Sequence, residues 1–294
     1  MITDGFLVVD KVAGMTSHDV VAIARRALGN NKVGHAGTLD PMATGVLVLG
    51  FGNGTRLLQY ITKGEKRYEA TIVLGVSTVT DDAQGEILIT TDASAITDEE
   101  IENELAKMVG LIQQRPSSVS AVKVGGQRAY SRVRAGENFE LAAREVNISA
   151  LEVSEIRRVD NKVEIDVEVT CGPGTFIRAI ARDCGDHLKV GGHLRRLHRT
   201  LVAPFDLESA VSLDDLKSGK FSPLPISEVA GLTFASREIS KSDEIELSFG
   251  RSISPNETDE ITAALLSDRL LALLLNKAGQ ASPIAVFANQ IVKE

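Results

Sequence analysis

Apolar and polar residues recur along the first 200 positions with the periods of strands and helices. The run FLVVD at 6–10 predicts a short buried strand, and VEIDVEVT at 163–170 alternates strictly, as a strand with one buried face does. A helical apolar pattern follows Thr16 or Ser17, either of which can cap it, and stops at Gly29. The same criteria predict two more strands, at 46–50 and 68–75, and two more helices, at 98–109 and 174–188. The fold class predicted is α+β or mixed α/β.

Beyond about residue 230 the pattern changes to shorter segments separated by polar turns. Three of them, at 244–250, 269–279 and 282–289, suggest a small β-rich domain. The NKAGQAS connection between the last two is typical of a hairpin. We therefore expect a larger domain over residues 1–230 and a smaller one over 231–294.

Composition places the chain among folded proteins and excludes several classes. The sequence has 294 residues, of which 43% are hydrophobic and 24% charged. Its longest apolar run, at 270–275, falls far short of the roughly 20 residues that cross a bilayer, and the N-terminus does not resemble a signal peptide. Two cysteines, Cys171 and Cys184, do not suggest a disulfide framework. We expect a cytoplasmic protein with reduced cysteines and no membrane partner.

The net charge of −8 argues at first sight against a nucleic-acid partner, because phosphate binding depends on Lys and Arg. The acidity, however, lies mainly after residue 205. Residues 171–200 carry six basic against two acidic side chains. The basic residues are Arg178, Arg182, Lys189, Arg195, Arg196 and Arg199. This segment either meets phosphates or forms a solvated helix face.

The most informative stretch is residues 34–60, where glycines surround His35 and Asp40 just before an apolar strand. Pro41 disfavours the α conformation at Asp40 and removes one backbone donor, so the carboxylate is expected on a stiff, extended hinge. An Asp-Pro pair can also serve only to turn the chain. Asp40 is therefore a candidate catalytic group rather than an assigned one at this point.

Other chemistries lack the spacing that they require. Neither a dinucleotide-binding glycine motif nor a phosphate-binding P-loop occurs, and no serine stands in a nucleophile elbow. Three histidines and two cysteines crowd the segment after residue 170, but without the pair spacings of metal sites: His187, His193, His198, Cys171 and Cys184. We expect neither a metal nor a cofactor.

Residues 34–47, GHAGTLDPMATGVL, resemble the signature loop of the TruB family of tRNA pseudouridine synthases. Five further blocks follow the order of that family, at 7–21, 66–75, 115–137, 172–185 and 193–200. The last 60 residues resemble the family's small PUA-type RNA-binding domain more loosely. The resemblance implies a pseudouridine synthase fold with a central mixed, mainly antiparallel sheet, followed by that PUA-like domain.

The resemblance also implies roles for individual residues. Asp40 matches the catalytic aspartate, Tyr68 the tyrosine that stacks on the target base, and Arg178 the arginine that pairs with the aspartate. His35 matches a histidine that helps to extrude the base. Further substrate-binding residues are expected in the pocket or at phosphates: Lys66, Arg67, Phe176, Leu197, Arg195 and Arg196. The sequence departs from the family pattern at three positions, Val12, Val119 and Phe176, the last replacing a frequent tyrosine.

The activity implied is the isomerisation of uridine 55 in the T loop of tRNA, by base flipping and by cleavage and rejoining of the glycosidic bond. The expected partner is the T arm of tRNA, without a guide RNA, metal or cofactor. The aspartate can act as a nucleophile or as a base, and the sequence leaves both open. Two alternatives also remain, a non-catalytic tRNA-binding or tRNA-folding module and a guide-RNA-dependent synthase of the dyskerin type.

Overall fold

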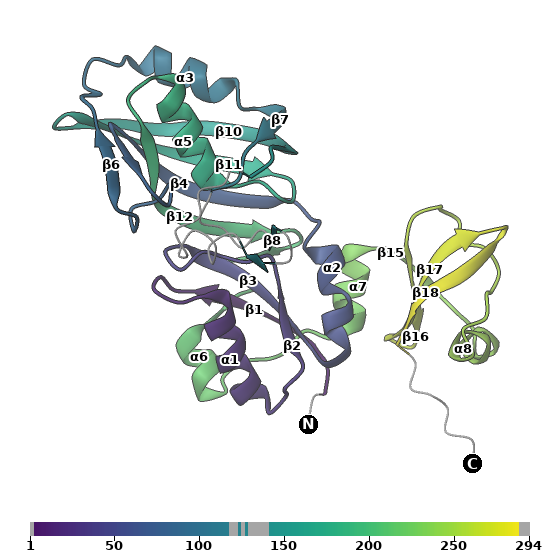
Figure 1. The fold of residues 1–294 in the computed structure, drawn as a ribbon. Coiled ribbons are helices and arrows are strands. Elements are labelled where there is room, and N and C mark those ends of the chain that lie inside the picture. The colour runs from purple at the N-terminus through teal and green to yellow at the C-terminus, as the bar shows by residue number, and fades with distance from the viewer. Residues whose placement is uncertain (1–2, 118–122, 125–126, 129–140, 288–294) are drawn as a thin grey trace.

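The computed structural model describes residues 3–117, 123–124, 127–128 and 141–287 (Figure 1). Val119, one of the departures from the family pattern, lies outside them. Within the described residues no helix is long and apolar enough to span a membrane.

A ten-stranded sheet forms the body of the molecule. Its strand order is β14-β1-β3-β12-β4-β11-β10-β7, with β2 paired to β3 and β13 to β12. Only β1 with β14 and β3 with β12 run parallel among these pairings, so the predicted mixed, mainly antiparallel sheet is confirmed. The strands are β1 (Gly5–Lys11), β2 (Val33–Ala36), β3 (Thr44–Phe51), β4 (Lys66–Leu74), β7 (Gly110–Gln114), β10 (Arg144–Val159), β11 (Lys162–Cys171), β12 (Gly192–Val202), β13 (Phe205–Asp206) and β14 (Val211–Ser212).

Helices cover the sheet and connect its strands. The pair α3 (Asp98–Ala106) and α5 (Ile177–His187) packs on the face formed by β4, β10 and β12 (Figure 1). Beside β1 lie α1 (Ser17–Leu28) and α6 (Leu213–Ser218), which contact each other. The short η1 (Gly52–Arg56) and α2 (Leu58–Ile61) join β3 to β4, and two separate ribbons pair β5 (Val76–Thr78) with β6 (Ile87–Thr90) and β8 (Lys123–Val124) with β9 (Gln127–Arg128).

The predicted helix starts follow from capping. Thr16 accepts from the backbone N–H of Asp19 while the Asp19 carboxylate accepts from the Thr16 N–H, and the left-handed Gly29 closes α1. The second predicted helix, 98–109, is capped by Thr97 in the same way but ends three residues early. The third, 174–188, begins only at Ile177.

The C-terminal part is a four-stranded sheet of order β15-β16-β17-β18 with two helices. Its elements are α7 (Ile226–Thr233), β15 (Ala235–Glu238), α8 (Lys241–Ser248), β16 (Thr262–Leu266), β17 (Arg269–Lys277) and β18 (Gln280–Val286). The hairpin between β17 and β18 is confirmed, with Ala278 and Gly279 at positive φ in its turn. The segment 244–250, which was expected to belong to a β-rich domain, is instead mostly helical. Most of it lies in α8, where Ser240 and Asp243 form a capping box. The last predicted segment, 282–289, ends outside the described residues.

Candidate functional site

A pocket of about 330 Å³ opens where the chain after β2, the start of β4, the start of α5 and β12 meet. Six of the predicted site residues line it, namely Asp40, Lys66, Tyr68, Phe176, Arg178 and Leu197. A larger cavity, of about 430 Å³, separates the segment 223–227 from β17 and is lined by none of the predicted site residues. The first pocket is therefore the candidate site.

Asp40 stands in a segment whose backbone is held from two sides. The hydroxyl of Ser17, in α1, donates to the Leu39 carbonyl oxygen at 3.2 Å and accepts from the Leu39 N–H at 2.8 Å. The fully buried Lys11 donates to the carbonyl oxygens of Ala43 at 2.6 Å and Pro41 at 3.3 Å. Burial lowers the pKa of Lys11 to about 8, although Asp40 nearby opposes this shift. These hydrogen bonds restrain the backbone on both sides of Asp40.

Arg178 joins Asp40 to a second carboxylate. Its Nε lies 2.9 Å from Asp40 Oδ2, and its Nη1 lies 3.2 Å from Asp82 Oδ2 and 2.7 Å from the Thr80 carbonyl oxygen. Arg178 and Asp82 are buried, whereas the Asp40 side chain is 36% exposed. Asp82 is fixed in turn by the Thr80 hydroxyl at 2.6 Å and by the N–H of Gln84 at 3.0 Å. The guanidinium is thereby oriented toward the pocket, and the predicted pairing of Asp40 with Arg178 is present.

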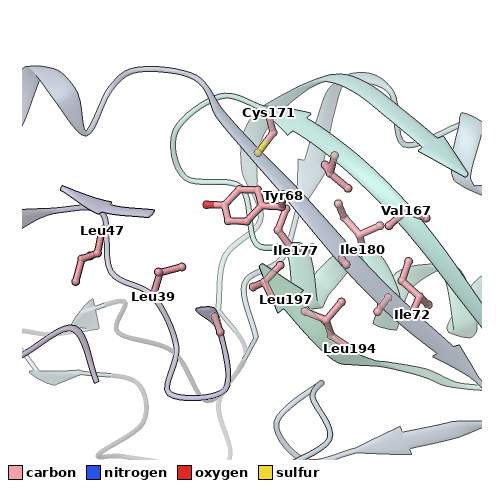
Figure 2. Close-up of a cluster of buried hydrophobic side chains, with 14 of the residues drawn as sticks. Leu39, Leu47, Tyr68, Ile72, Val167, Cys171, Ile177, Ile180, Leu194 and Leu197 are labelled. Carbon is pink, nitrogen blue, oxygen red and sulfur yellow. The ribbon is translucent and has the colours of Figure 1, made fainter. Parts of the chain in front are cut away.

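Tyr68, in β4, lines the same pocket as the start of α5. Figure 2 shows its ring near Ile177 and Leu197, with the hydroxyl directed toward the side of Leu39. Desolvation raises the pKa of Tyr68, while the neighbouring Arg199 guanidinium opposes this. The phenol is therefore protonated at neutral pH, and its ring offers an apolar face.

Arg199 lines the pocket, although the sequence analysis named it only as one of six basic residues in the segment 171–200. It is 1% exposed, and it faces Tyr68 in the pairing of β12 with β4. Its Nε donates to the Val46 carbonyl oxygen at 2.8 Å, and its Nη2 to that of Gly37 at 3.0 Å. It therefore ties β12 to β3 and to the segment that carries Asp40. Its place in a basic cluster suggested phosphate contact, and only the alternation along β12 could have indicated burial.

Lys66, at the start of β4, lies on the pocket wall but points its ammonium group at backbone. Its Nζ donates to the carbonyl oxygens of Thr62 at 2.7 Å and Gly64 at 2.6 Å. Burial is the main cause that lowers the pKa of Lys66 to about 8, and Arg199 adds to it. Lys66 is thus a cation inside the pocket rather than on a phosphate-facing surface.

His35 does not line the pocket, although its strand β2 leads into the Asp40 segment. Its ring packs edge-on against His18 with centroids 5.5 Å apart. Its buried Nδ1 has no hydrogen-bond partner in the described part of the chain. Burial lowers the pKa of His35 to about 4, so the ring is neutral at physiological pH.

Three predicted substrate-binding arginines lie on the opposite face of the sheet. Successive residues of a strand point to opposite faces, so Arg67 and Arg196 point away from the pocket side of Tyr68 and Leu197. All three are exposed and paired with glutamates: Arg67 with Glu168, Arg195 with Glu164 and Arg196 with Glu69. The structure does not bring them to the pocket, and their phosphate contacts remain predictions.

The residues considered for a metal site are dispersed. His187 contacts Glu104, His193 the carbonyl oxygen of Val76 and His198 the hydroxyl of Thr44. Both cysteines are buried and free. Among the described residues, no group of three or more His, Cys, Asp or Glu side chains is arranged to hold a metal ion.

Comparisons with protein-family models and with individual known proteins identify the same family. Residues 25–177 match the family model described as TruB family pseudouridylate synthase (N terminal domain), and residues 178–222 match that of the tRNA pseudouridylate synthase B C-terminal domain. The chain is 49% identical to tRNA pseudouridine synthase B of Thermobifida fusca, covering 97% of this chain and 99% of that protein. It is 50% identical to that of Nocardia farcinica, with 96% and 92% covered.

Solved structures share the fold at lower identity. A Cbf5-Nop10-Gar1 complex contains a chain that superposes with a TM-score of 0.73 at 23% identity, covering 98% of this chain and 86% of that one. A chain of an H/ACA RNP bound to a substrate RNA superposes with a TM-score of 0.72 at 21% identity, with 99% and 87% covered. This likeness concerns the fold.

Proposed function

This chain belongs to the TruB family of pseudouridine synthases, and from this premise we propose that it isomerises a uridine of tRNA to pseudouridine, with Asp40 as the catalytic carboxylate. The observation that carries the proposal is the contact of Asp40 with the buried Arg178 in a pocket that also presents the Tyr68 ring. Relatives about half identical over nearly the full chain are named tRNA pseudouridine synthase B.

The chemistry requires little beyond these groups. Isomerisation breaks the N1–C1′ bond, turns the uracil and joins C1′ to C5, so it consumes neither water nor an external oxidant. A carboxylate held next to the ribose can attack C1′ or remove a proton from the sugar. The guanidinium of Arg178, whose Nε lies 2.9 Å from Asp40 Oδ2, holds the Asp40 side chain in place at the pocket. We propose no metal and no cofactor.

The pocket suits one extruded base rather than a paired segment. A base within a folded loop must be flipped out to be reached, at a cost of a few kcal/mol. At about 330 Å³, the pocket is near the small end of ligand sites. Tyr68 would stack on the base, while Leu197 and Phe176 would form apolar walls. His35, beside the Asp40 segment, would assist extrusion as a neutral ring.

The finer features of the substrate rest on family membership. We propose uridine 55 of the T loop as the target, the T arm as the bound element, the cytoplasm as the location and no requirement for a guide RNA. Residues 231–294 would be the PUA-like RNA-binding domain. One of the solved structures of the same fold is an H/ACA RNP bound to a substrate RNA and the other is a Cbf5-Nop10-Gar1 complex, but identities of 21% and 23% support no partner for this chain.

The test is a single-turnover assay on unmodified tRNA transcript without any other RNA, with pseudouridine mapped at nucleotide resolution. Conversion at uridine 55 alone is expected, as is loss of all conversion in Asp40→Asn with tRNA affinity nearly unchanged. Binding without conversion by the wild type would favour the non-catalytic module. Conversion only after addition of a guide RNA would favour the dyskerin-type alternative. Turnover by Asp40→Asn would refute the role of Asp40.

A further inference from the structure

Gln114 is a buried amide at the end of the edge strand β7. Its residue is 1% exposed, whereas the preceding Gln113, on the other face of the strand, is exposed. Neither the sequence patterns nor the proposed chemistry accounts for a fully buried glutamine there. A buried amide is costly unless its donor and acceptor are both paired, so its partners indicate what it does.

Both partners of Gln114 are the backbone of one pocket residue. The Phe176 N–H donates to Gln114 Oε1 at 2.7 Å, and Gln114 Nε2 donates to the Phe176 carbonyl oxygen at 3.0 Å. The two bonds fix the peptide groups on both sides of Phe176, 62 residues away in the chain. The side-chain amide thus acts like one pairing position of an additional strand.

Phe176 is the residue from which α5 begins. It lines the pocket and occupies the N-cap position with φ −106° and ψ 105°, but its side chain makes no capping hydrogen bond. Arg178 follows two residues later and reaches Asp40 and Asp82 from the first turn. The first turn of α5 is therefore located by whatever holds the Phe176 backbone.

The chain before Phe176 provides few other restraints. Residues 172–174 are Gly-Pro-Gly, and Gly174 has a positive φ of 85°. The Gly172 N–H is held by the Asn147 carbonyl oxygen at 2.8 Å, and the Thr175 hydroxyl donates back to Gly172 at 3.1 Å. Gln114 supplies the anchor at the far end of this segment.

We propose that Gln114 is a positioning residue for the isomerisation, which fixes Phe176 against the base and sets where Arg178 meets Asp40. The inference rests on the proposed function and adds to it a residue that does not line the pocket. Displacement of a reacting group by about 1 Å can cost on the order of 10²-fold in rate. A purely structural role would instead lower the amount of folded enzyme and leave its rate constant unchanged.

The first experiment compares Gln114→Met with the matched control Gln113→Met on the same strand. Methionine has a similar volume and removes both hydrogen bonds. With folded enzyme in excess of tRNA, the single-turnover rate constant does not depend on the folded fraction. We expect a fall of about 10- to 100-fold for Gln114→Met, with tRNA affinity within about twofold of wild type, and no change for Gln113→Met. A rate constant equal to that of the wild type would overturn the inference, whereas an inactive wild type would overturn the proposed function instead.

The second experiment uses Gln114→Glu, which serves also if the methionine variant fails to fold. The introduced carboxylate can accept from the Phe176 N–H but cannot donate to its carbonyl oxygen, whereas the protonated carboxyl can do both. Burial raises the pKa of a carboxyl group, so the protonated form becomes more populated as pH falls toward that raised value. The ratio of the variant's rate constant to that of wild type should therefore rise as pH is lowered from about 8 to about 5.5. A flat ratio across this range would contradict the role of the paired amide.

Discussion

At the scale of single residues, substitutions of Tyr68 distinguish a role in stacking from a role in proton transfer. Its ring lies against the apolar pocket wall, and its raised pKa keeps the hydroxyl protonated (Figure 2). Stacking on a base is worth roughly 1–3 kcal/mol, so Tyr68→Leu should slow isomerisation roughly 5- to 150-fold. Tyr68→Phe should retain most of the activity, losing only the contact of the hydroxyl with Arg199. Single-turnover rates with saturating enzyme measure both, and a Phe variant as slow as the Leu variant, with tRNA still bound, would assign the hydroxyl a chemical role.

His35 provides a prediction of stability against pH. Its pKa is lowered to about 4 in the folded protein, from an ordinary value near 6.5, so between these values the unfolded chain binds more protons than the folded one. Stability should therefore decline as pH falls from about 6.5 to about 4, by up to about 3 kcal/mol from this residue. His35→Gln should lose less stability over that window than the wild type does, and urea titrations at a series of pH values measure the difference. Equal pH slopes for wild type and His35→Gln would contradict the assignment.

The residues found from the sequence are those that carry a local signal. Asp40 precedes a proline in a glycine-rich loop, and Tyr68 and Arg178 stand in family blocks. Arg199, Asp82 and Gln114 were missed because their partners lie between 62 and 162 residues away. The three outward arginines Arg67, Arg195 and Arg196 show the converse, since charge clustering in sequence does not reveal which face of a strand a residue takes.

At the scale of elements, α5 lies unusually close to the turn before β12. A Cβ at Gly185 would come within 2.2 Å of the Gly191 carbonyl carbon and the Gly192 nitrogen, and both of these are backbone atoms that cannot rotate away. In an open helix Gly→Ala stabilises by about 1 kcal/mol. Here the clash should dominate, so Gly185→Ala should destabilise the protein by about 3 kcal/mol or more. Denaturant unfolding measures this change.

The control for this prediction is Gly231, in α7. A Cβ there would meet no atom within 4 Å, and the residue is exposed. Gly231→Ala should stabilise by about 0.5–1 kcal/mol. The same substitution is thus expected to have opposite signs in two helices, and a common sign would contradict the close approach of α5 to β12.

Element types were predictable where periodicity and caps agreed, as in α1, β11 and the β17–β18 hairpin. The start of α5 was placed three residues early because the apolar pattern continues through Phe176, while the tertiary bonds from Gln114 hold that residue extended. The segment in α8 was assigned to a β-rich domain because its capping box, from Ser240 to Asp243, precedes the apolar residues that drew attention.

At the scale of the whole molecule, the C-terminal sheet shares a hydrophobic core with the larger part. Phe6, Val8, Leu57, Leu58 and Ile61 pack in one buried cluster with Val229, Ala230, Ala263, Leu270 and Leu273. The rings of Tyr60 and Phe234 meet edge-on at 5.1 Å, and the Arg56 guanidinium lies 4.6 Å from the centre of the Phe287 ring. The boundary between residues 230 and 231 remains a prediction, and it divides this cluster.

Substitutions within β17 test the shared core in the intact chain. Leu273 is fully buried in the cluster, whereas Leu275, two positions further along, is 36% exposed. Leu273→Ala should lower the free energy of unfolding by about 2–5 kcal/mol, and Leu275→Ala by considerably less. If the two variants unfold at the same denaturant concentration, the cluster does not contribute as the packing indicates.

Deletion of residues 231–294 should separate stability, binding and chemistry. The deletion removes Leu270 and Leu273 from the shared cluster, and burial of each of these side chains stabilises the fold by roughly 2 kcal/mol. The truncated chain should therefore be at least about 4 kcal/mol less stable. Every proposed catalytic residue precedes residue 200, so the fraction that remains folded should retain single-turnover activity at saturating tRNA. Its affinity for tRNA should fall, because the proposed RNA-binding domain is absent. Circular dichroism, filter binding and single-turnover assays on the same preparation measure the three effects, and a folded truncation without turnover at saturating tRNA would place an essential group after residue 230.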